Sequence, residues 1–96
     1  MRANLSGAGL IKTQLEGADL SEANLTHAVL VESNLSKANL AGAELQGANL
    51  NGARLDGADL EGVDLGSVFG LTRAQLEAAQ SVDWTMAPTY LRQQDA

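Results

Sequence analysis

Leucine recurs at every fifth position between residues 5 and 65. On an α-helix of about 3.6 residues per turn, a step of five rotates each side chain by roughly 140° and would spread the leucines around the whole cylinder. On a straight strand, an odd step would place successive leucines on opposite faces. The spacing therefore predicts a backbone that turns once per unit in the same sense, and equal turns stack into a solenoid. The leucines are Leu5, Leu10, Leu15, Leu20, Leu25, Leu30, Leu35, Leu40, Leu45, Leu50, Leu55, Leu60 and Leu65.

Each unit also has a fixed order of residue types around its leucine, which we number position i. Position i−2 is Ala in ten of the thirteen units, and the exceptions are Thr13, Ser33 and Val63. Position i−1 is mostly Asn or Asp, and position i+2 is Gly in seven units, which suits a turn with positive φ. We therefore expect i and i−2 inside, i−1 and i+1 outside, and i+2 at a corner.

Units such as residues 23–27, 38–42 and 58–62 resemble the A(D/N)LXX consensus of the pentapeptide-repeat family. Thirteen consecutive units of this kind cover about two-thirds of the chain. The resemblance implies an all-β solenoid, a right-handed quadrilateral β-helix with four pentapeptides per coil, in which residues twenty apart stack. Residues 1–70 are then expected to form three to four coils, and residues 71–96 a short C-terminal α-helical cap.

The C-terminal third changes to a helical pattern. Thr72 and Gln75 have the spacing of a capping box for a helix from about Arg73 to Gln80. Residues 81–87 are expected to be a loop, and residues 88–93, which begin with proline, a second short helix.

The aromatic residues all lie in this last third, at Phe69, Trp84 and Tyr90. We expect Val68 and Phe69 to replace the usual inward pair, and the aromatic side chains to close the end of the core. Solenoids need such terminal caps to stay soluble.

Composition excludes several classes of function. With 96 residues the chain has room for one domain, and without cysteine it has no disulfide and no thiolate metal site. It contains no apolar run of about 18 residues and no signal-like start, so we expect a cytoplasmic protein that does not enter a membrane. Its net charge of −6 disfavours direct binding to nucleic acid and is compatible with a basic partner.

The titratable residues do not form a catalytic or metal-binding constellation. His27 is the only histidine and occupies a corner position. Asp19 and Asp59 would share one face about 9.6 Å apart, near the range of inverting glycosidases, but on a flat ladder without a cleft. Asp56, Asp59 and Glu61 could attract a cation, but they diverge from one another. We therefore expect no catalytic, cofactor or metal residues, and a protein that is not an enzyme.

One face carries apolar residues at outward positions that are polar in most other units. Ile11 and Val31 are the most apolar i+1 residues and are twenty apart, and Gly9 and Val29 take the polar i−1 position beside them. One interpretation is that β-branched residues are merely tolerated on this surface. The other is that Ile11, Val29 and Val31 form a flat contact patch for a protein partner that the sequence does not identify.

The N-terminal coil is the second candidate contact. Because the repeat starts at once, the layer of Leu5, Leu10, Leu15 and Leu20 should present an open edge. This edge would allow a homodimer, or a continuation of the chain upstream.

These observations favour a non-enzymatic scaffold or protein-interaction module. The alternative comes from the family resemblance, since some pentapeptide-repeat proteins mimic DNA and bind DNA-processing enzymes such as gyrase. Those proteins are long, strongly acidic rods, whereas this chain would be a few coils tall and mildly acidic.

Overall fold

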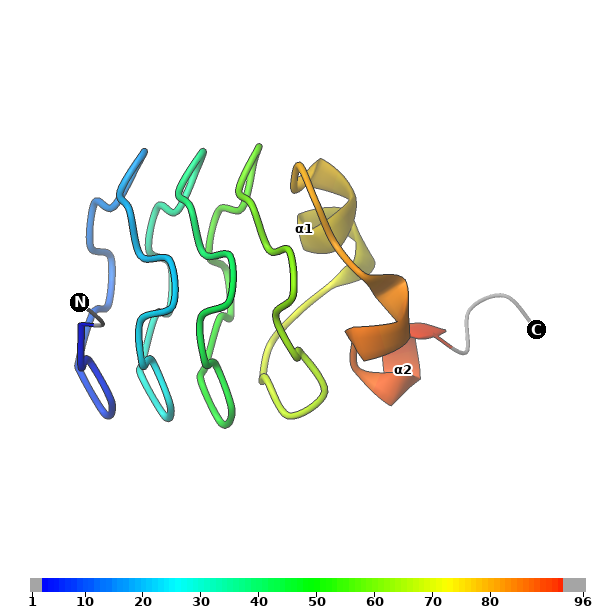
Figure 1. Cartoon of the computed structure of the whole chain (residues 1–96), viewed down its shortest axis with the longest axis horizontal. Coiled ribbons are helices and arrows are strands. Elements are labelled where there is room, and N and C mark those ends of the chain that lie inside the picture. Colours follow the sequence, from blue (N-terminus) through cyan, green and yellow to red (C-terminus); the bar gives the residue numbers. More distant parts are fainter. Residues whose placement is uncertain (1–2, 93–96) are drawn as a thin grey trace.

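The computed structural model describes residues 3–92, which form a stack of coils followed by three short helices (Figure 1). Three full coils comprise residues 3–22, 23–42 and 43–62. The helices are α1 (Arg73–Ala78), the 3-10 helix η1 (Trp84–Met86) and α2 (Thr89–Arg92). Within residues 3–92, no helix is both long and apolar enough to cross a lipid bilayer.

Parallel bridges join residues that are twenty apart, which confirms the predicted register. They run from the first coil to the second at Asn4–Asn24, Gly9–Val29, Gln14–Asn34 and Asp19–Asn39. Every bridge is isolated, and residues 3–92 contain no continuous strand, because a turn interrupts the extended backbone in every unit. Four bridges per coil give the stack four faces.

Two neighbouring coils contribute unequal numbers of N–H donors to the hydrogen bonds between them. Twelve backbone hydrogen bonds join the first coil to the second, of which the first coil donates eight and the second donates four. The second coil likewise donates eight hydrogen bonds to the third coil, and the third donates four to the second. The eight donors of the first coil are the N–H groups of Leu5, Gly7, Leu10, Lys12, Leu15, Gly17, Leu20 and Glu22. The four that donate in the opposite direction belong to Asn24, Val29, Asn34 and Asn39.

Leucine and alanine fill the interior, as the repeat predicts. Burial of one leucine side chain stabilises the fold by about 1.5–3 kcal/mol, so the columns dominate the folding energy. Ser33 replaces an inward alanine and is fully buried, and its hydroxyl donates to the carbonyl of Leu30 at 2.8 Å. The leucines exposed by no more than 1% are Leu25, Leu30, Leu35, Leu40, Leu45, Leu50, Leu55, Leu60 and Leu65.

The corners from Gly7 to Gly62 have positive φ at position i+2, as predicted, and this holds even where glycine is absent. The glycines there have φ between 70° and 74°. Gly70, which stands at the leucine position of the next unit and ends the repeat, has φ of 81°. Five other residues adopt φ between 57° and 61°: Lys12, Glu22, His27, Glu32 and Lys37. The geometry of the coil therefore imposes this conformation, because these residue types rarely adopt it on their own.

The prediction that both Val68 and Phe69 point inward is wrong for Phe69. Val68 is buried, but 63% of the surface of Phe69 is exposed. The N–H of Phe69 donates to the carbonyl of Ala48 at 2.8 Å, as the N–H of every i−1 residue in the second and third coils donates to the coil before. Phe69 therefore keeps the outward i−1 position, and Val68 takes the inward i−2 position.

The helix α1 begins with the predicted capping box, in which the side chains of Thr72 and Gln75 bond each other's backbone N–H. It ends at Ala78 rather than at Gln80, because Ala79 is extended. The N–H of Gln80 instead donates to the carbonyl of Ala58 at 2.8 Å in the third coil.

The rest of the C-terminal segment also differs in detail from the prediction. Ser81 bridges Asp59, and η1 forms inside the predicted loop. The helix α2 spans Thr89–Arg92, and residue 93, the predicted end of this helix, lies outside the described residues.

The buried core residues at this end are aliphatic, and of the three aromatic side chains only Trp84 packs against them. Tyr90 is 50% exposed, with its hydroxyl donating to the carbonyl of Leu71 at 2.9 Å, and Trp84 is half-buried. A ring with a polar group keeps that group near water or a partner, so it lies at the margin of the core. The core cluster at this end consists of Leu71, Leu76, Ala87 and Leu91.

Candidate functional site

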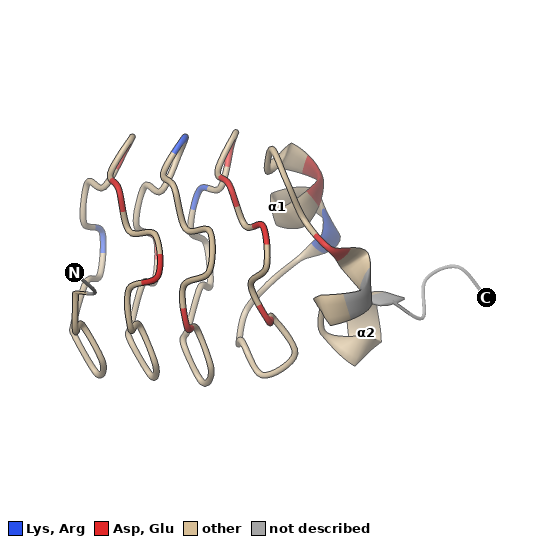
Figure 2. Cartoon of the chain, in the orientation of Figure 1, with Lys and Arg blue, Asp and Glu red and all other residues tan. Residues whose placement is uncertain are grey.

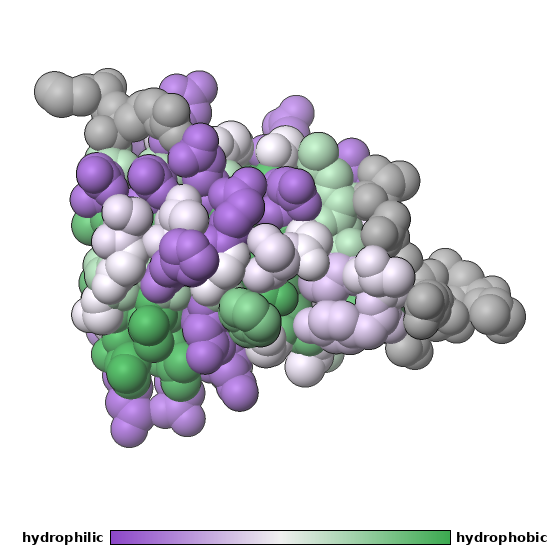
Figure 3. Space-filling view, turned by 90° about the horizontal axis from the view of Figure 1, so that it is seen from below, coloured by the Kyte–Doolittle hydropathy of each residue, from purple (hydrophilic) through white to green (hydrophobic). Residues whose placement is uncertain are grey.

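The apolar face, which we define as Ile11, Val29 and Val31, lies on two neighbouring coils. The bridge from Gly9 to Val29 and the 2.9 Å hydrogen bond from the N–H of Lys12 to the carbonyl of Val31 bring these residues together. Ile11 is 58% exposed, whereas Val29 and Val31 are half-buried. Figure 3 shows apolar side chains gathered over the first coils.

A repeated side-chain hydrogen bond accounts for the Asn and Asp residues at position i−1 of eight units. The side chain of Asn24 accepts from the N–H of Thr26 at 3.1 Å, and Asp19 accepts in the same way from Ser21. This is an Asx turn, which satisfies the i+1 N–H group that the ladder leaves without a carbonyl. Sequence reasoning placed the Asn and Asp residues outside but missed this role.

The apolar face lacks this bond. Gly9 and Val29 carry no side-chain acceptor, so neither can bond the N–H of the residue two positions later. The units of Gln14, Glu44 and Arg54 also lack the Asx bond, but they carry polar side chains at position i−1. The reason to consider this face for a function is therefore its apolar side chains, those of Ile11, Val29 and Val31.

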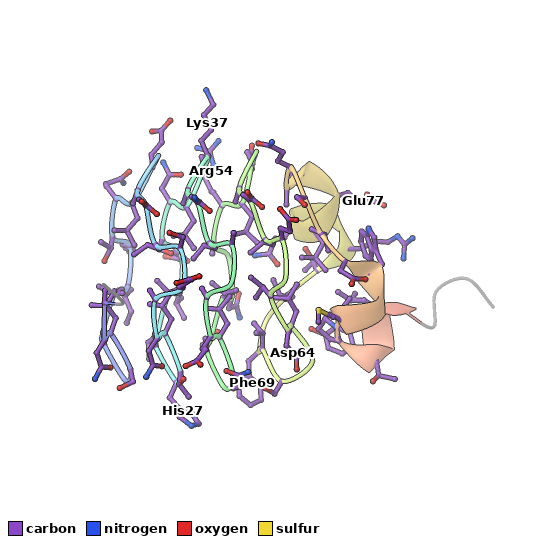
Figure 4. The ribbon with its side chains drawn as sticks, viewed as in Figure 1. His27, Lys37, Arg54, Asp64, Phe69 and Glu77 are labelled. Atoms are coloured by element: carbon purple, nitrogen blue, oxygen red, sulfur yellow. The ribbon has the colours of Figure 1, made fainter. Side chains whose placement is uncertain are left out.

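Polar residues surround the apolar face and keep it small. At its corner, Lys12 and Glu32 form an ion pair at 3.8 Å, and both side chains are mostly exposed, so the pair contributes little stability. The bridges continue from Val29 through Asn49 to the exposed Phe69. Figure 4 shows Phe69 and His27 on the same lower margin of the stack.

The leucines of the first coil are less buried than those of the second and third coils. Leu5, Leu10 and Leu15 are half-buried and pack against the core, and Leu20 is 9% exposed. A hollow of about 210 Å³ next to this layer is lined in part by Ala3 and Leu20.

The structure aligns the carboxylates considered for catalysis without building a pocket around them. The ladder runs from Asp19 through Asn39 to Asp59, on a side of the stack where acidic residues lie along the coils (Figure 2). The hydroxyl and the N–H of Ser21 donate to Asp19 at 2.7 Å and 3.1 Å and lower the pKa of that carboxyl. Asp19 is thus held as a carboxylate and is a poor proton donor.

The other titratable candidates are dispersed. His27 occupies an exposed corner with φ of 61°. Within the part of the chain that the structure describes, no three His, Asp or Glu side chains are placed to hold a metal ion together.

One concave site was not predicted from the sequence. It lies between α1 and η1, with a volume of about 420 Å³, and Arg73, Gln80 and Trp84 are among its lining residues. The guanidinium of Arg73 lies 5.1 Å from the centre of the Trp84 ring and donates to Glu77 at 3.1 Å. The Arg73–Glu77 pair has the local i,i+4 spacing of a helix, but the contact of Arg73 with Trp84 joins two separate elements, so no local motif could have indicated it.

Comparison with known proteins identifies the five-residue repeat as that of a known family. A family model described as pentapeptide repeats matches residues 1–36 and 28–66, with eight copies. No curated protein matches. A solved pentapeptide repeat protein, Rfr23 from the cyanobacterium Cyanothece 51142, is 36% identical with a TM-score of 0.53, over 69% of this chain and 58% of that protein.

Two further solved structures are similar at lower scores. A pentapeptide repeat protein of the Arabidopsis thaliana thylakoid lumen is 21% identical with a TM-score of 0.49, over 82% of this chain and 55% of that one. HetL of Nostoc sp. strain PCC 7120, involved in heterocyst differentiation regulation, is 31% identical with a TM-score of 0.41, over 91% of this chain and 47% of that one. The present chain thus spans about half the length of these relatives.

Proposed function

The chain belongs to the pentapeptide-repeat family, and from this premise we propose that it is a non-enzymatic scaffold that binds a protein partner through the apolar face. Family membership implies a right-handed quadrilateral β-helix, and the register of twenty residues supports four units per coil. The observation that carries the proposal is the exposure of Ile11 beside Val29 and Val31, on a surface whose other units are polar.

The energetics favour a weak, specific contact. Covering the exposed part of one aliphatic side chain contributes on the order of 1 kcal/mol, so three such residues supply a small apolar centre. A stable interface also needs a polar rim and roughly 800 Å² from each partner. The ion pair of Lys12 and Glu32 beside the face can form part of that rim.

The test compares two aspartate substitutions in one outward column. Ile11→Asp places a charge in the apolar face, whereas Asn51→Asp places the same charge two coils away, at another exposed i+1 position. Pull-downs from the source cell with wild type and both variants, matched by circular dichroism, should lose a specific partner only with Ile11→Asp. Identical partner lists for the three proteins would refute the role of the face.

We also propose that residues 71–96 act as the predicted cap. Three carbonyl groups of this segment support the proposal, because those of Ala78, Ser81 and Met86 accept from N–H groups of the repeat at 2.8–2.9 Å. The amide nitrogen of Gln75 donates to the carbonyls of Leu50 and Ala53 at 3.0 Å and 2.9 Å.

Gln75→Ala tests the cap. The variant removes these bonds and the capping box, and should cost about 2 kcal/mol in the free energy of unfolding. Gln80→Ala is the control, because the bond of Gln80 to the third coil uses its backbone N–H and survives the substitution. Equal stability of both variants would contradict the proposal.

No contact in the structure favours the alternative, a DNA-mimicking binder of a DNA-processing enzyme such as gyrase, and it stays a prediction. The homodimer through the N-terminal coil likewise stays a prediction.

A further inference from the structure

The apolar face contains a backbone donor that the rest of the repeat would pair. In eight units an Asn or Asp side chain at position i−1 accepts from the N–H at position i+1, as Asn24 does from Thr26 at 3.1 Å. Position i−1 before Ile11 is Gly9, and within residues 3–92 no group accepts from the Ile11 N–H. Because outward side chains bond this N–H in the other units, the donor belongs to the side of the stack and not to the edge of a coil.

Gly9 leaves open the position where the other units carry their acceptor. A Cβ added at Gly9 would meet no heavy atom within 4 Å. In the next coil Val29 occupies the corresponding position with a hydrocarbon side chain. Ile11 is 58% exposed and Val29 is half-buried, so the open position lies beside apolar surface.

A partner that covers the apolar face has to bring an acceptor to this position. In the free protein the Ile11 N–H can bond water. A purely hydrocarbon surface laid over the face would displace that water and bury the N–H unpaired, which opposes binding. The partner segment is therefore not apolar throughout, and its acceptor has to reach the space over Gly9.

We propose that the partner of the apolar face places the carboxylate of an aspartate side chain over Gly9, where it accepts from the Ile11 N–H, and that apolar residues flank this aspartate. Hydrogen bonds to an ionised acceptor are roughly twice as strong as neutral ones, and the Lys12 ammonium belongs to the same unit. Lys12 and Glu32 are the only charged residues of units 8–12, 28–32 and 48–52, so this side of the stack adds nothing to the net charge of −6. The inference rests on the proposed function and names the chemistry of its partner.

The experiment uses the peptide acetyl-Leu-Asp-Leu-amide, which carries one carboxylate between two apolar side chains. It is titrated into isotope-labelled full-length protein to about 10 mM, since so small a contact binds in the millimolar range, and the amide signals are followed by NMR. We expect a saturable downfield shift of the Ile11 amide proton. The matched peptide acetyl-Leu-Asn-Leu-amide should bind at least about fivefold more weakly, because its acceptor is neutral.

Two substitutions at Gly9 separate the hydrogen bond from steric crowding, and neither is strained, because Gly9 does not have a left-handed φ. Gly9→Asn supplies an acceptor within the chain, as Asn24 does, and should abolish the shift at Ile11. Gly9→Ala adds a methyl group without an acceptor and should retain it. No saturable shift, equal binding of the two peptides, or a shift that survives Gly9→Asn would overturn the proposal. Since the probe is a synthetic peptide, its failure is distinct from a failure of the Ile11→Asp pull-down.

Discussion

At single corner residues the coil imposes a conformation that costs free energy. Lys37 has φ of 60°, is exposed, and donates its N–H to the carbonyl of Asp56 at 2.8 Å. A left-handed conformation costs a residue with a side chain about 1–2 kcal/mol. Glycine avoids this cost, but it loses more conformational entropy on folding, which offsets part of the gain. Lys37→Gly should therefore raise the free energy of unfolding by about 1 kcal/mol in urea titrations followed by circular dichroism. Lys37→Ala controls for the lost side chain and should gain much less, so equal gains would contradict the strain argument.

The Asx turn makes a second prediction at the scale of one residue. The Ser21 hydroxyl is the main cause of the lowered pKa of Asp19, with a further contribution from the Ser21 N–H. Ser21→Ala should move the pKa of Asp19 upward towards its ordinary value, while the N–H bond retains part of the shift. NMR titration of the carboxyl measures this, and Ser6→Ala, which affects only Asn4, should leave the pKa of Asp19 unchanged.

The direction of the linked stability follows from the sign of that shift. Because the folded-state pKa of Asp19 is lowered, its hydrogen bond stabilises the fold above the ordinary carboxyl pKa, and this stabilisation is lost as the pH falls through the folded-state pKa. Acid unfolding of wild type and Ser21→Ala should therefore converge at the lowest pH and separate towards neutral pH. A constant difference at all pH values would exclude the linkage.

At the scale of elements, the turn that leaves the repeat is more tightly constrained than the turns within it. Gly70 has φ of 81°, and an added Cβ would lie 2.7 Å from the backbone N and Cα of Asn51. Gly62 has φ of 73° but would place its Cβ in open space. We expect Gly70→Ala to cost about 3 kcal/mol or more and Gly62→Ala about 1 kcal/mol in the free energy of unfolding. Similar losses would show that φ alone matters.

The elements also show where sequence reasoning ends. The leucine spacing and the corner glycines predict a coil and its corner conformation, because each depends on a local pattern repeated many times. Thr72 and Gln75 predict the start of α1 for the same reason. The register of twenty residues was implied by the resemblance to the pentapeptide-repeat family, since a spacing of five does not fix the number of units per coil. The end of α1 at Ala78 and the second role of Gln75 depend on contacts with the third coil, which have no local signal.

The candidate sites likewise have features that the sequence predicts and features that depend on contacts between elements. The sequence predicted that Ile11, Val29 and Val31 lie together, since stacking at twenty residues is enough to place them. It did not predict that the two valines are half-buried or that Phe69 is outward, because neighbouring coils and the C-terminal segment decide exposure.

For the whole molecule, the near-equivalence of the four faces predicts which deletions the stack tolerates. Removing residues 23–27 joins Glu22 to Ala28, keeps leucine at every fifth position and moves each earlier unit round by one face. The buried Ser33 tolerates the shift, because its hydroxyl bonds Leu30 within its own strand-and-turn unit. The variant should lose about 2 kcal/mol, roughly the burial of Leu25, and still protect the amides of residues 3–22 from hydrogen exchange.

Removing residues 23–28 instead shortens one spacing to four and turns every earlier leucine out of its column. The N–H groups of residues 3–22 then no longer face the carbonyls of the next coil, and the apolar column is broken at the same point. This variant should therefore expose the amides of residues 3–22 to rapid exchange while those of the third coil stay protected, because each coil depends on its neighbours alone. If the two deletions gave the same exchange pattern, the faces would not be interchangeable, and the stack would depend on particular side-chain pairs rather than on its repeat.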